Sequence, residues 1–248
     1  MIKVLINGCC GKMGSIVAET IKNNNEFEIF GGYDRKNEKC DFKVYTNIND
    51  IPLKPDVIID FSLPVATFKI LEYAIYNSIP IVIATTGFSE PENLKIKEYS
   101  KQIPIFKSAN MSYEINLITN LLKTIAPKLK DNDIEIIETH HNRKVDSPSG
   151  TAILLANSIN DSVDNKFSYE FDRFNKHEKR DKNKIGFSSI RGGNIVGEHS
   201  IIFFGESETL EIKHTALNRK VFADGALKAA KFIINKQDGL YNMDDLIN

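Results

Sequence analysis

The stretch IKVLINGCCGKMGSIVAETIKNN, residues 2–24, decides the fold that the sequence predicts. It opens on a short, β-branched apolar run at 2–7, which is typical of a strand buried on both faces. A glycine-rich turn follows, and residues 11–24 then have the pattern of a helix. A buried strand, a glycine turn and a helix in this order predict the first unit of a parallel α/β sheet.

The same alternation continues through the first half of the chain. Ser89 and Glu92 have the spacing of a capping box, which predicts the start of one of the helices. Strands that alternate with helices indicate a doubly wound parallel sheet. Further strands are predicted at 27–34, 56–62, 79–87 and 103–108, with another helix at 65–77.

The pattern changes after about residue 110, where strand candidates follow one another without helices between them. This arrangement predicts an antiparallel or mixed sheet. Helices are expected at 112–129, near 149–160 and at 220–236, and strands at 133–141, 167–174, 184–193, 194–205 and 208–216. We therefore predict a Rossmann-like, dinucleotide-binding domain from 1–110 and 218–248, and a smaller α+β substrate-binding and oligomerisation domain from 111–217.

Composition excludes several classes of protein. The chain has 248 residues and a formal net charge of -1, with no basic excess that would favour nucleic acid or a membrane surface. No apolar run approaches the roughly 20 residues of a membrane span, and the N-terminus does not resemble a signal peptide. Cys9, Cys10 and Cys40 form no C-x-x-C pair, so we predict no bound metal and a reduced, cytoplasmic protein. The charged run at 175–184 is expected to be a solvated loop.

The glycine turn predicts a nucleotide site. Gly8, Gly11 and Gly14 follow a strand and open a helix, where backbone N–H groups can receive a pyrophosphate. Asp34 lies about 20 residues further on, where an acid that binds ribose hydroxyls is expected. A tight turn with close helix packing is the alternative. Asp34 favours NADH, whereas Arg35 beside it could pair with the 2′-phosphate of NADPH, so both cofactors stay open.

A second motif, ETHHNRKVDSPSGTA, spans residues 138–152. Ser147 or Ser149 can cap the helix that follows. The backbone N–H groups of Gly150 and Thr151 would then be unpaired at the positive end of the helix dipole. This arrangement predicts an anion site of a size that suits a carboxylate or a phosphate.

Cationic side chains precede this turn. Lys144 would strengthen the anion site, and His140 or His141 could exchange a proton near neutral pH. The alternative is one packed and one solvated imidazole. Structural or solvated positions are predicted for four other residues of this half of the chain: Arg191, His199, His214 and His177.

The motif at 138–152 resembles the E-x-H-H-x-x-K-x-D-x-P-S-G-T-A signature of the 4-hydroxy-tetrahydrodipicolinate reductase family, which acts in lysine and diaminopimelate biosynthesis. The resemblance extends over nearly the whole chain, and includes the nucleotide loop and the segments 60–67, 83–88, 108–112, 190–219 and 221–233. The family departs from this chain at Cys9 and Cys10, where it more often has small residues, and at Tyr113 and Glu114.

The resemblance implies roles for individual residues. His140 matches the proton donor and acceptor, and Lys144 a second proton donor. His141, Ser149, Gly150 and Thr151 match positions that bind a substrate carboxylate. The cofactor, NADH or NADPH, is implied to contact Gly8, Cys10, Gly11, Lys12, Met13, Asp34, Arg35, Ala84, Thr85, Thr86, Ala109, Asn110 and Met111.

The resemblance also implies a reaction and an assembly. The expected reaction is reduction of a small dicarboxylate, 4-hydroxy-tetrahydrodipicolinate, through its dehydrated form, to tetrahydrodipicolinate. The family is usually a homotetramer joined through its substrate domains. Two alternatives stay open: another two-domain nicotinamide-dependent amino-acid dehydrogenase, and a non-catalytic nucleotide sensor. A sensor would be expected to lose the acid and the anion site, which this sequence retains.

Overall fold

The computed structural model shows two compact units, each with its own sheet and its own apolar core. The first unit comprises Met1–Tyr113 and Arg219–Asn248, and the second comprises Glu114–Asn218. The domain boundaries predicted from the sequence lie within a few residues of these limits. The residues that the structure describes are 1–37, 40–52, 54–174 and 176–248.

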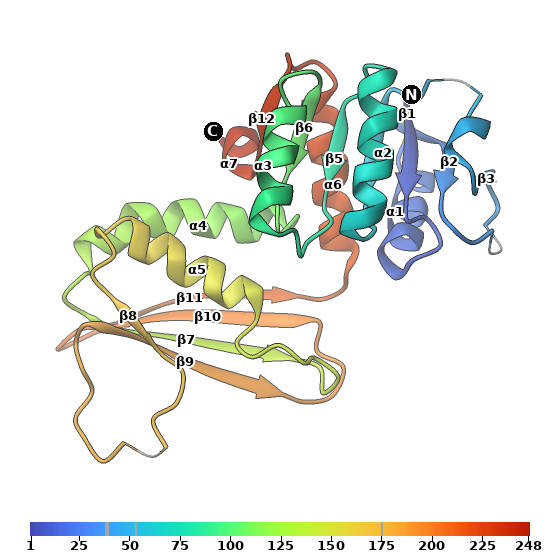
Figure 1. The fold of residues 1–248 in the computed structure, drawn as a ribbon. Helices are drawn as coiled ribbons and strands as arrows, with labels where there is room; N and C mark the ends of the chain where they lie inside the picture. Colours follow the sequence, from blue (N-terminus) through green and yellow to red (C-terminus); the bar gives the residue numbers. More distant parts are fainter. Residues whose placement is uncertain (38–39, 53, 175) are drawn as a thin grey trace. The chain divides into compact units, whose positions relative to one another are not determined.

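The first unit contains a seven-stranded sheet in the order β12-β6-β5-β4-β1-β2-β3, with every pair of neighbours parallel (Figure 1). From β1 the chain proceeds toward one edge through β2 and β3, and from β4 it proceeds toward the other. The strand order therefore reverses between β1 and β4, where ligands bind in sheets of this type. The strands are β1 Ile2–Asn7, β2 Phe27–Tyr33, β3 Val44–Tyr45, β4 Val57–Asp60, β5 Ile81–Ile83, β6 Pro104–Lys107 and β12 Gly239–Tyr241.

Helices cover both faces of this sheet. Val4 and Ile6 of β1 pack with the helices α1 and α6, whereas Leu5 between them packs with α2 and α3. This follows from the alternation of side chains along a strand. Among the described residues, no helix is long and apolar enough to cross a membrane. The helical segments are α1 Lys12–Lys22, η1 Ile48–Asp50, α2 Pro64–Tyr76, α3 Glu90–Tyr99, α6 Lys220–Ile233 and α7 Met243–Ile247.

The second unit contains a mixed five-stranded sheet in the order β11-β10-β7-β9-β8. β10 is antiparallel to β7 and β11, while β9 is parallel to β7 and β8. Apolar residues of β7 pack against α4 and α5, so that helices cover one face. The elements are α4 Tyr113–Ile125, η2 Ala126–Lys128, β7 Asp133–His140, α5 Gly150–Asp161, β8 Ser168–Glu170, β9 Lys184–Arg191, β10 Gly197–Phe204 and β11 Thr209–Ala216.

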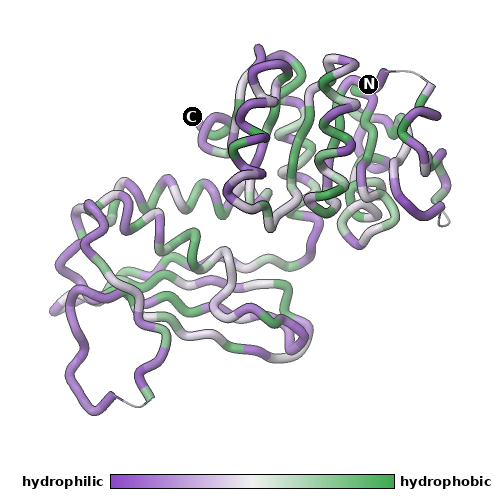
Figure 2. Tube along the Cα trace, viewed as in Figure 1, coloured by the Kyte–Doolittle hydropathy of each residue, from purple (hydrophilic) through white to green (hydrophobic). Residues whose placement is uncertain are grey.

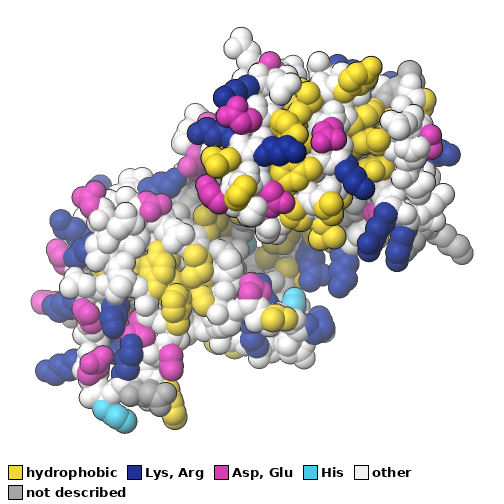
Figure 3. Space-filling model, in the orientation of Figure 1, with side chains coloured by type: hydrophobic (Ala, Val, Ile, Leu, Met, Phe, Trp, Pro, Cys, Tyr) yellow, Lys and Arg dark blue, Asp and Glu magenta, His cyan; other side chains and the backbone are white. Residues whose placement is uncertain are grey.

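The connection between β8 and β9 corrects one prediction. Figure 2 shows this arm as almost continuously hydrophilic, and Figure 3 shows basic and acidic side chains interspersed on it. The run at 175–184 was expected to be solvated, but the Arg180 side chain is only 16% exposed. Its guanidinium donates to Asp133 at 2.8 Å, to Glu135 at 3.0 Å and to backbone carbonyls. The prediction was wrong for this residue because acceptors from distant strands converge on it.

Candidate active site

The glycine turn after β1 has a backbone that other residues cannot adopt. Gly8 has φ +79°, and a Cβ there would lie 2.5 Å from the carbonyl oxygen of Phe61. The Gly8 N–H donates to Tyr33 O at 2.9 Å, and the Gly11 N–H donates to Gly8 O at 3.0 Å. The turn is therefore tied to β2 and closed on itself, which is the conformation that a phosphate-binding loop requires.

The turn leads directly into α1, whose first turn includes Lys12 and Met13. Gly11 is the N-cap and supplies no side-chain hydrogen bond to the helix. The leading N–H groups of α1 can therefore face an anion, and the helix dipole favours negative charge there. Gly14 keeps the helix close to the turn, since a Cβ at this position would lie 2.2 Å from Gly8 O. These residues fit a dinucleotide pyrophosphate.

Replacing Gly14 with alanine is expected to weaken cofactor binding by about tenfold or more, because a clash of this kind typically costs about 1–3 kcal/mol. The added methyl group must push the turn away from α1. Titration of NADH or NADPH, followed by nicotinamide fluorescence, measures the effect. Gly192→Ala is the matched control, since its Cβ would meet no atom within 4 Å. Equal affinity in both variants would remove the turn from the cofactor site.

Asp34 lies where β2 ends, beside the glycine turn. Its carboxylate accepts the Cys10 N–H at 3.1 Å and the Lys36 N–H at 3.3 Å. Asp34 and Arg35 line one cavity of about 590 Å³ together with Gly8, Cys10 and Gly11. The acid that could bind ribose hydroxyls and the cation that could pair with a 2′-phosphate thus share the cavity with the turn.

Asp60, for which no role was predicted from the sequence, organises the carboxyl ends of the central strands. Its fully buried carboxylate accepts hydrogen bonds from Asn7 at 2.8 Å, Ser62 at 2.5 Å, Thr67 at 2.6 Å and Thr85 at 2.9 Å. Burial raises the pKa of Asp60, and these four donors oppose that shift. Because Asn7 ends β1 and Thr85 follows β5, the network connects three neighbouring strands. An Asp followed shortly by Ser and Thr at a strand end was the available sequence signal.

The remaining predicted cofactor residues follow β5 and β6. Ala84 donates its N–H to Asp60 O, and the Thr85 hydroxyl also accepts the Ser62 N–H. Asn110 accepts the Ser112 N–H at 2.8 Å, and the Met111 side chain is buried in the apolar core. Thr86 and Ala109 are both exposed. These segments therefore lie at the same carboxyl edge as the glycine turn.

In the second unit, Glu138 connects several predicted site residues. The side chain is buried, and Arg191 binds it through two hydrogen bonds of 2.8 and 2.6 Å. Glu138 also accepts the Ser149 N–H at 3.1 Å and contacts His140 Nδ1 at 2.5 Å. Burial alone would raise the pKa of Glu138, but Arg191 and the other donors hold it at about 2. The carboxyl group is therefore ionised at neutral pH.

This ionised carboxylate orients the imidazole of His140. Because Glu138 can only accept, His140 carries a proton on Nδ1, and Nε2 is the atom that can exchange one. A Cβ at Gly197 would lie 3.0 Å from that Nε2, so glycine leaves room beside it. Burial lowers the pKa of His140, and Glu138 opposes that shift.

A second imidazole, that of His199, packs edge-on to His140 with the ring centroids 5.1 Å apart. Its Nε2 lies 3.0 Å from the Ser149 hydroxyl, which also accepts the Ala152 N–H as the N-cap of α5. Burial lowers the pKa of His199 to about 3, so the ring is neutral at neutral pH. Ser149, rather than Ser147, therefore caps the helix, and the structural role predicted for His199 is to hold that cap.

The predicted anion site already holds a carboxylate from the chain itself. Asp146 lies 2.8 Å from the Lys144 ammonium, and the Gly150 N–H faces its carboxylate closely enough to lower its pKa. Burial alone would raise the pKa of Asp146, but Lys144 and the backbone N–H groups of Asp146 and Gly150 lower it. The Gly150 N–H was predicted to be unpaired, but it faces an acid of the same loop. Thr151 follows Gly150 in the first turn of α5.

His141 lies in the loop that follows β7. Its backbone N–H donates to Ile195 O at 2.8 Å, and its carbonyl accepts the Lys144 N–H at 3.1 Å. Arg191 donates to the backbone carbonyl of Asp146 at 2.7 Å. The structure thus brings His140, Lys144 and the start of α5 together around Glu138 and Arg191. No separate role was predicted for Glu138 from the sequence, and a structural role was predicted for Arg191.

Comparisons with known proteins decide the family. Residues 2–111 match the family described as Dihydrodipicolinate reductase, N-terminus, and residues 114–247 match Dihydrodipicolinate reductase, C-terminus. The chain belongs to the dihydrodipicolinate reductase family. The N-terminal match lies within the first compact unit. The C-terminal match covers the second unit and continues into the returning segment that contains α6.

Individual relatives agree with this assignment. The chain is 51% identical over 250 residues to the 4-hydroxy-tetrahydrodipicolinate reductase of Clostridium tetani, strain Massachusetts / E88, with 100% of this chain and 98% of that relative covered. It is 49% identical over 249 residues to the enzyme of the same name from Clostridium novyi, strain NT, with the same coverage. The structure of a dipicolinate-bound dihydrodipicolinate reductase from Paenisporosarcina sp. TG-14 has the same fold, with a TM-score of 0.82, 24% identity, and 98% and 97% of the two chains covered.

Membership confirms the resemblance, the fold class and the enzyme class that the sequence predicted. The protein is an oxidoreductase with a Rossmann-like domain that uses NADH or NADPH. The non-catalytic sensor and the amino-acid dehydrogenase are therefore set aside.

Proposed function

We propose that the chain reduces 4-hydroxy-tetrahydrodipicolinate, through its dehydrated form, to tetrahydrodipicolinate in lysine and diaminopimelate biosynthesis. The observation that carries this proposal is the carboxylate position between Lys144 and Gly150, in the same unit as the Glu138-bound imidazole of His140. Relatives that carry this name are about half identical to the chain. A structure of the family also has dipicolinate, a small dicarboxylate, bound to it.

The proposed catalysis separates the sources of hydride and proton. The reduced nicotinamide supplies the hydride when it is bound. The substrate ring must then gain one proton to complete the two-electron reduction, and His140 Nε2 delivers it with assistance from Lys144. One substrate carboxylate binds at Gly150 and Thr151, and His141 and Ser149 help to position it. The glycine turn, Asp34 and the loops after β5 and β6 bind and orient the cofactor.

The negative charge of the bound substrate favours the protonated form of His140. In the free protein, burial lowers the pKa of His140, so the neutral imidazole predominates at neutral pH. The two negative charges of a bound dicarboxylate favour the imidazolium and raise that pKa. Protonated His140 is therefore formed when the substrate is present. The pKa that governs kcat is expected to lie above the one that governs kcat/KM.

Asp146→Asn is expected to bind a dicarboxylate about fivefold more tightly, because an exposed ion pair is worth about 1 kcal/mol or less. The Asp146 carboxylate, which is 58% exposed, occupies the position that we assign to the substrate. Calorimetric titration with dipicolinate measures the change. Asp164→Asn, an exposed substitution in the same unit, is the matched control. Weaker binding in Asp146→Asn would mean that Asp146 positions Lys144 and does not compete with the ligand.

The proposed reaction is tested by nicotinamide absorbance. Purified protein receives freshly generated 4-hydroxy-tetrahydrodipicolinate, with NADH and NADPH in separate reactions. Oxidation that depends on this substrate is the expected result, and the two rates show whether Asp34 or Arg35 dominates the choice of cofactor. No oxidation with either cofactor, in protein shown to bind nucleotide, would contradict the proposal.

The two units are proposed to have different roles. The first unit holds the cofactor, and the second binds the substrate and joins the subunits in a homotetramer. Two exposed apolar side chains on the face of the second sheet that the helices leave uncovered support a subunit contact. They are Ile190 at 51% and Phe204 at 42% exposure, at opposite ends of that face. Sedimentation equilibrium measures the mass of the assembly.

A further inference from the structure

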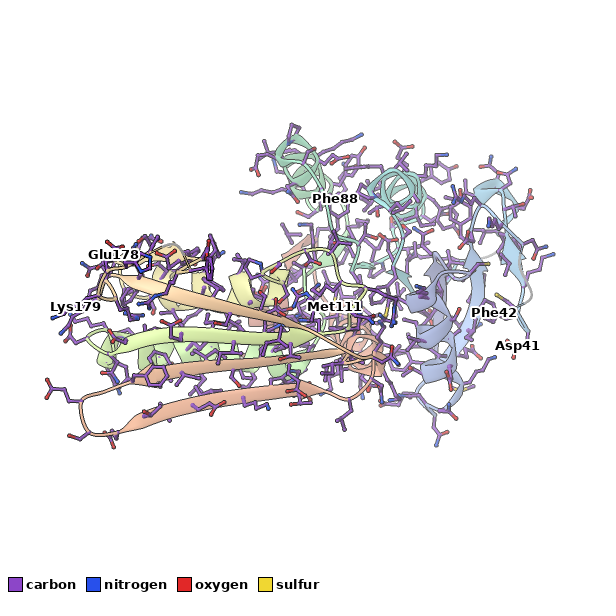
Figure 4. The ribbon with its side chains drawn as sticks, turned by 90° about the horizontal axis from the view of Figure 1, so that it is seen from below. Asp41, Phe42, Phe88, Met111, Glu178 and Lys179 are labelled. Carbon is purple, nitrogen blue, oxygen red and sulfur yellow. The ribbon has the colours of Figure 1, made fainter. Side chains whose placement is uncertain are left out.

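The structure brings the three cysteines of the chain together. Cys9 and Cys10 lie in the turn after β1, and Cys40 lies in the connection between β2 and β3. All three Sγ atoms lie within 4.8 Å of one another, and those of Cys9 and Cys10 are 3.8 Å apart. Figure 4 labels Asp41 and Phe42, the residues that follow Cys40. The spacing of the cysteines along the sequence gave no indication of this cluster. About thirty residues separate Cys10 from Cys40, and only the tertiary structure brings them together.

Packing holds two of these side chains in place. Cys9 is 1% exposed and lies over Gly32, where a Cβ would come within 2.3 Å of the Cys9 Sγ. The Cys10 N–H donates to Asp34, and the Cys10 thiol donates to Lys36 O at 3.3 Å. The glycine in β2 and the acid at its end thus hold both thiols on the side of the turn that faces Cys40.

Charge repulsion between the three sulfur atoms determines which kind of ligand the cysteine cluster can bind. Three thiolates this close would repel one another, and a bound cation offsets that repulsion. A metal ion that binds thiolates removes this obstacle and releases the protons. Three soft ligands in one place favour Zn²⁺ and related ions over hard cations such as Mg²⁺.

We infer that Cys9, Cys10 and Cys40 form a binding site for a thiophilic divalent ion such as Zn²⁺. A tetrahedral ion with bonds of about 2.3 Å to sulfur requires sulfur atoms about 3.8 Å apart. The Cys9–Cys10 separation of 3.8 Å meets this requirement, and Cys40 needs to move by only about 1 Å. Binding converts three thiols to thiolates and releases three protons. Zn²⁺ with three thiolates carries one negative charge, and water takes the fourth position.

The site shares residues with the proposed cofactor cavity. Cys10 and Asp34 line that cavity, and the two are joined by a hydrogen bond. An ion on Cys10 adds net negative charge beside Asp34 and draws the turn toward Cys40. Bound metal is therefore expected to weaken dinucleotide binding, a consequence that rests on the proposed location of the cofactor. Metal binding itself does not depend on that location.

Titration with Cd²⁺ tests the site directly. The full chain is freed of metal and kept reduced with a phosphine that contains no thiol. We expect one Cd²⁺ per chain, an ultraviolet thiolate-to-metal charge-transfer band, and three protons released per ion in a weakly buffered solution. Zn²⁺ should remove the band by displacement, whereas Mg²⁺ should not. A band absent at equimolar Cd²⁺, or proton release well below three, would overturn the inference.

Two variants identify the ligands. Cys40→Ser is expected to lose about a third of the band and to bind Cd²⁺ at least about tenfold more weakly, since even indirect support of a metal ligand is worth about 10–100-fold. Cys40 is only partly buried, so the chain should tolerate the change; Cys9→Ala provides a second test, with circular dichroism as the measure of folding. Asp41→Asn, adjacent in sequence with all three thiols retained, is the matched control. Titration of Cys40→Ser that matches wild type would overturn the three-thiol site.

A final measurement separates this inference from the proposed function. NADH binding is measured by fluorescence with and without one equivalent of Zn²⁺, in wild type and in Cys40→Ser. Weaker NADH binding in wild type alone supports competition at the shared cavity. Metal binding with unchanged NADH affinity overturns the competition and places the cofactor elsewhere, while the three-thiol site stands.

Discussion

Replacing His140 with glutamine is expected to lower kcat by about a hundredfold to ten-thousandfold, the usual contribution of a well-placed acid. Glutamine retains polarity near the position of the ring but cannot deliver a proton. Cofactor affinity should change little, because His140 lies in the second unit and the glycine turn in the first. Steady-state kinetics with saturating cofactor and substrate give kcat, and fluorescence titration gives cofactor affinity.

His177→Gln is the matched control for this variant. His177 lies in the exposed arm between β8 and β9 and belongs to the same unit. The control should retain wild-type kcat. Turnover of His140→Gln equal to that of the control would remove His140 from the proton-transfer step. A rise in KM with kcat unchanged would instead assign His140 to substrate binding.

Glu138→Gln is expected to destabilise the protein by about 3 kcal/mol, at the lower end of the cost of breaking a buried ion pair. The carboxylate is buried, but its partner Arg191 remains 20% exposed, so solvent relieves part of the loss. The variant leaves that guanidinium without its anion. Urea unfolding at neutral pH measures the difference, and Glu206→Gln, an exposed substitution in the same unit, is the control.

The pKa of Glu138 determines how the stability difference between wild type and Glu138→Gln changes with pH. Folding lowers the pKa of Glu138 to about 2 from its usual 4.5, so its contribution is present above the usual value and is lost as pH falls toward 2. The stability difference between wild type and Glu138→Gln should therefore shrink below about pH 4.5. An unchanged difference at pH 3 would show that packing, rather than charge, causes the effect.

Glu138→Gln should also shift the pH profile of kcat, which a purely structural role of Glu138 would not do. Glu138 raises the pKa of His140 against the effect of burial. Without this charge, the imidazole holds its proton less well, and the pH at which kcat falls should shift to lower values. If the profile keeps its position while kcat falls, Glu138 acts through the orientation of the ring alone.

Local patterns in the sequence were sufficient for most of the fold. The buried strand at 2–7 and its glycine turn predicted β1 and the start of α1, because neighbouring residues impose this geometry. Ser89 and Glu92 predicted the start of α3 for the same reason, and the Ser89 N–H donates to Glu92 at 2.7 Å. Short elements such as β3 and β12 were missed. Two or three residues carry too little periodicity, and these strands depend on pairing with β2 and β6.

The sequence by itself determined the family, the glycine turn and the identity of the residues at 138–152, because motifs and caps act between neighbours in the chain. Only the tertiary structure decided the partners of those residues. Pairing of β7 with β9 places Arg191 opposite His140 and within reach of Glu138. Folding likewise brings Cys40 to Cys9, and Thr85 to Asp60. Buried charges and hydrogen-bonding groups need partners, and strand order, which single segments do not encode, determines which distant side chain supplies each one.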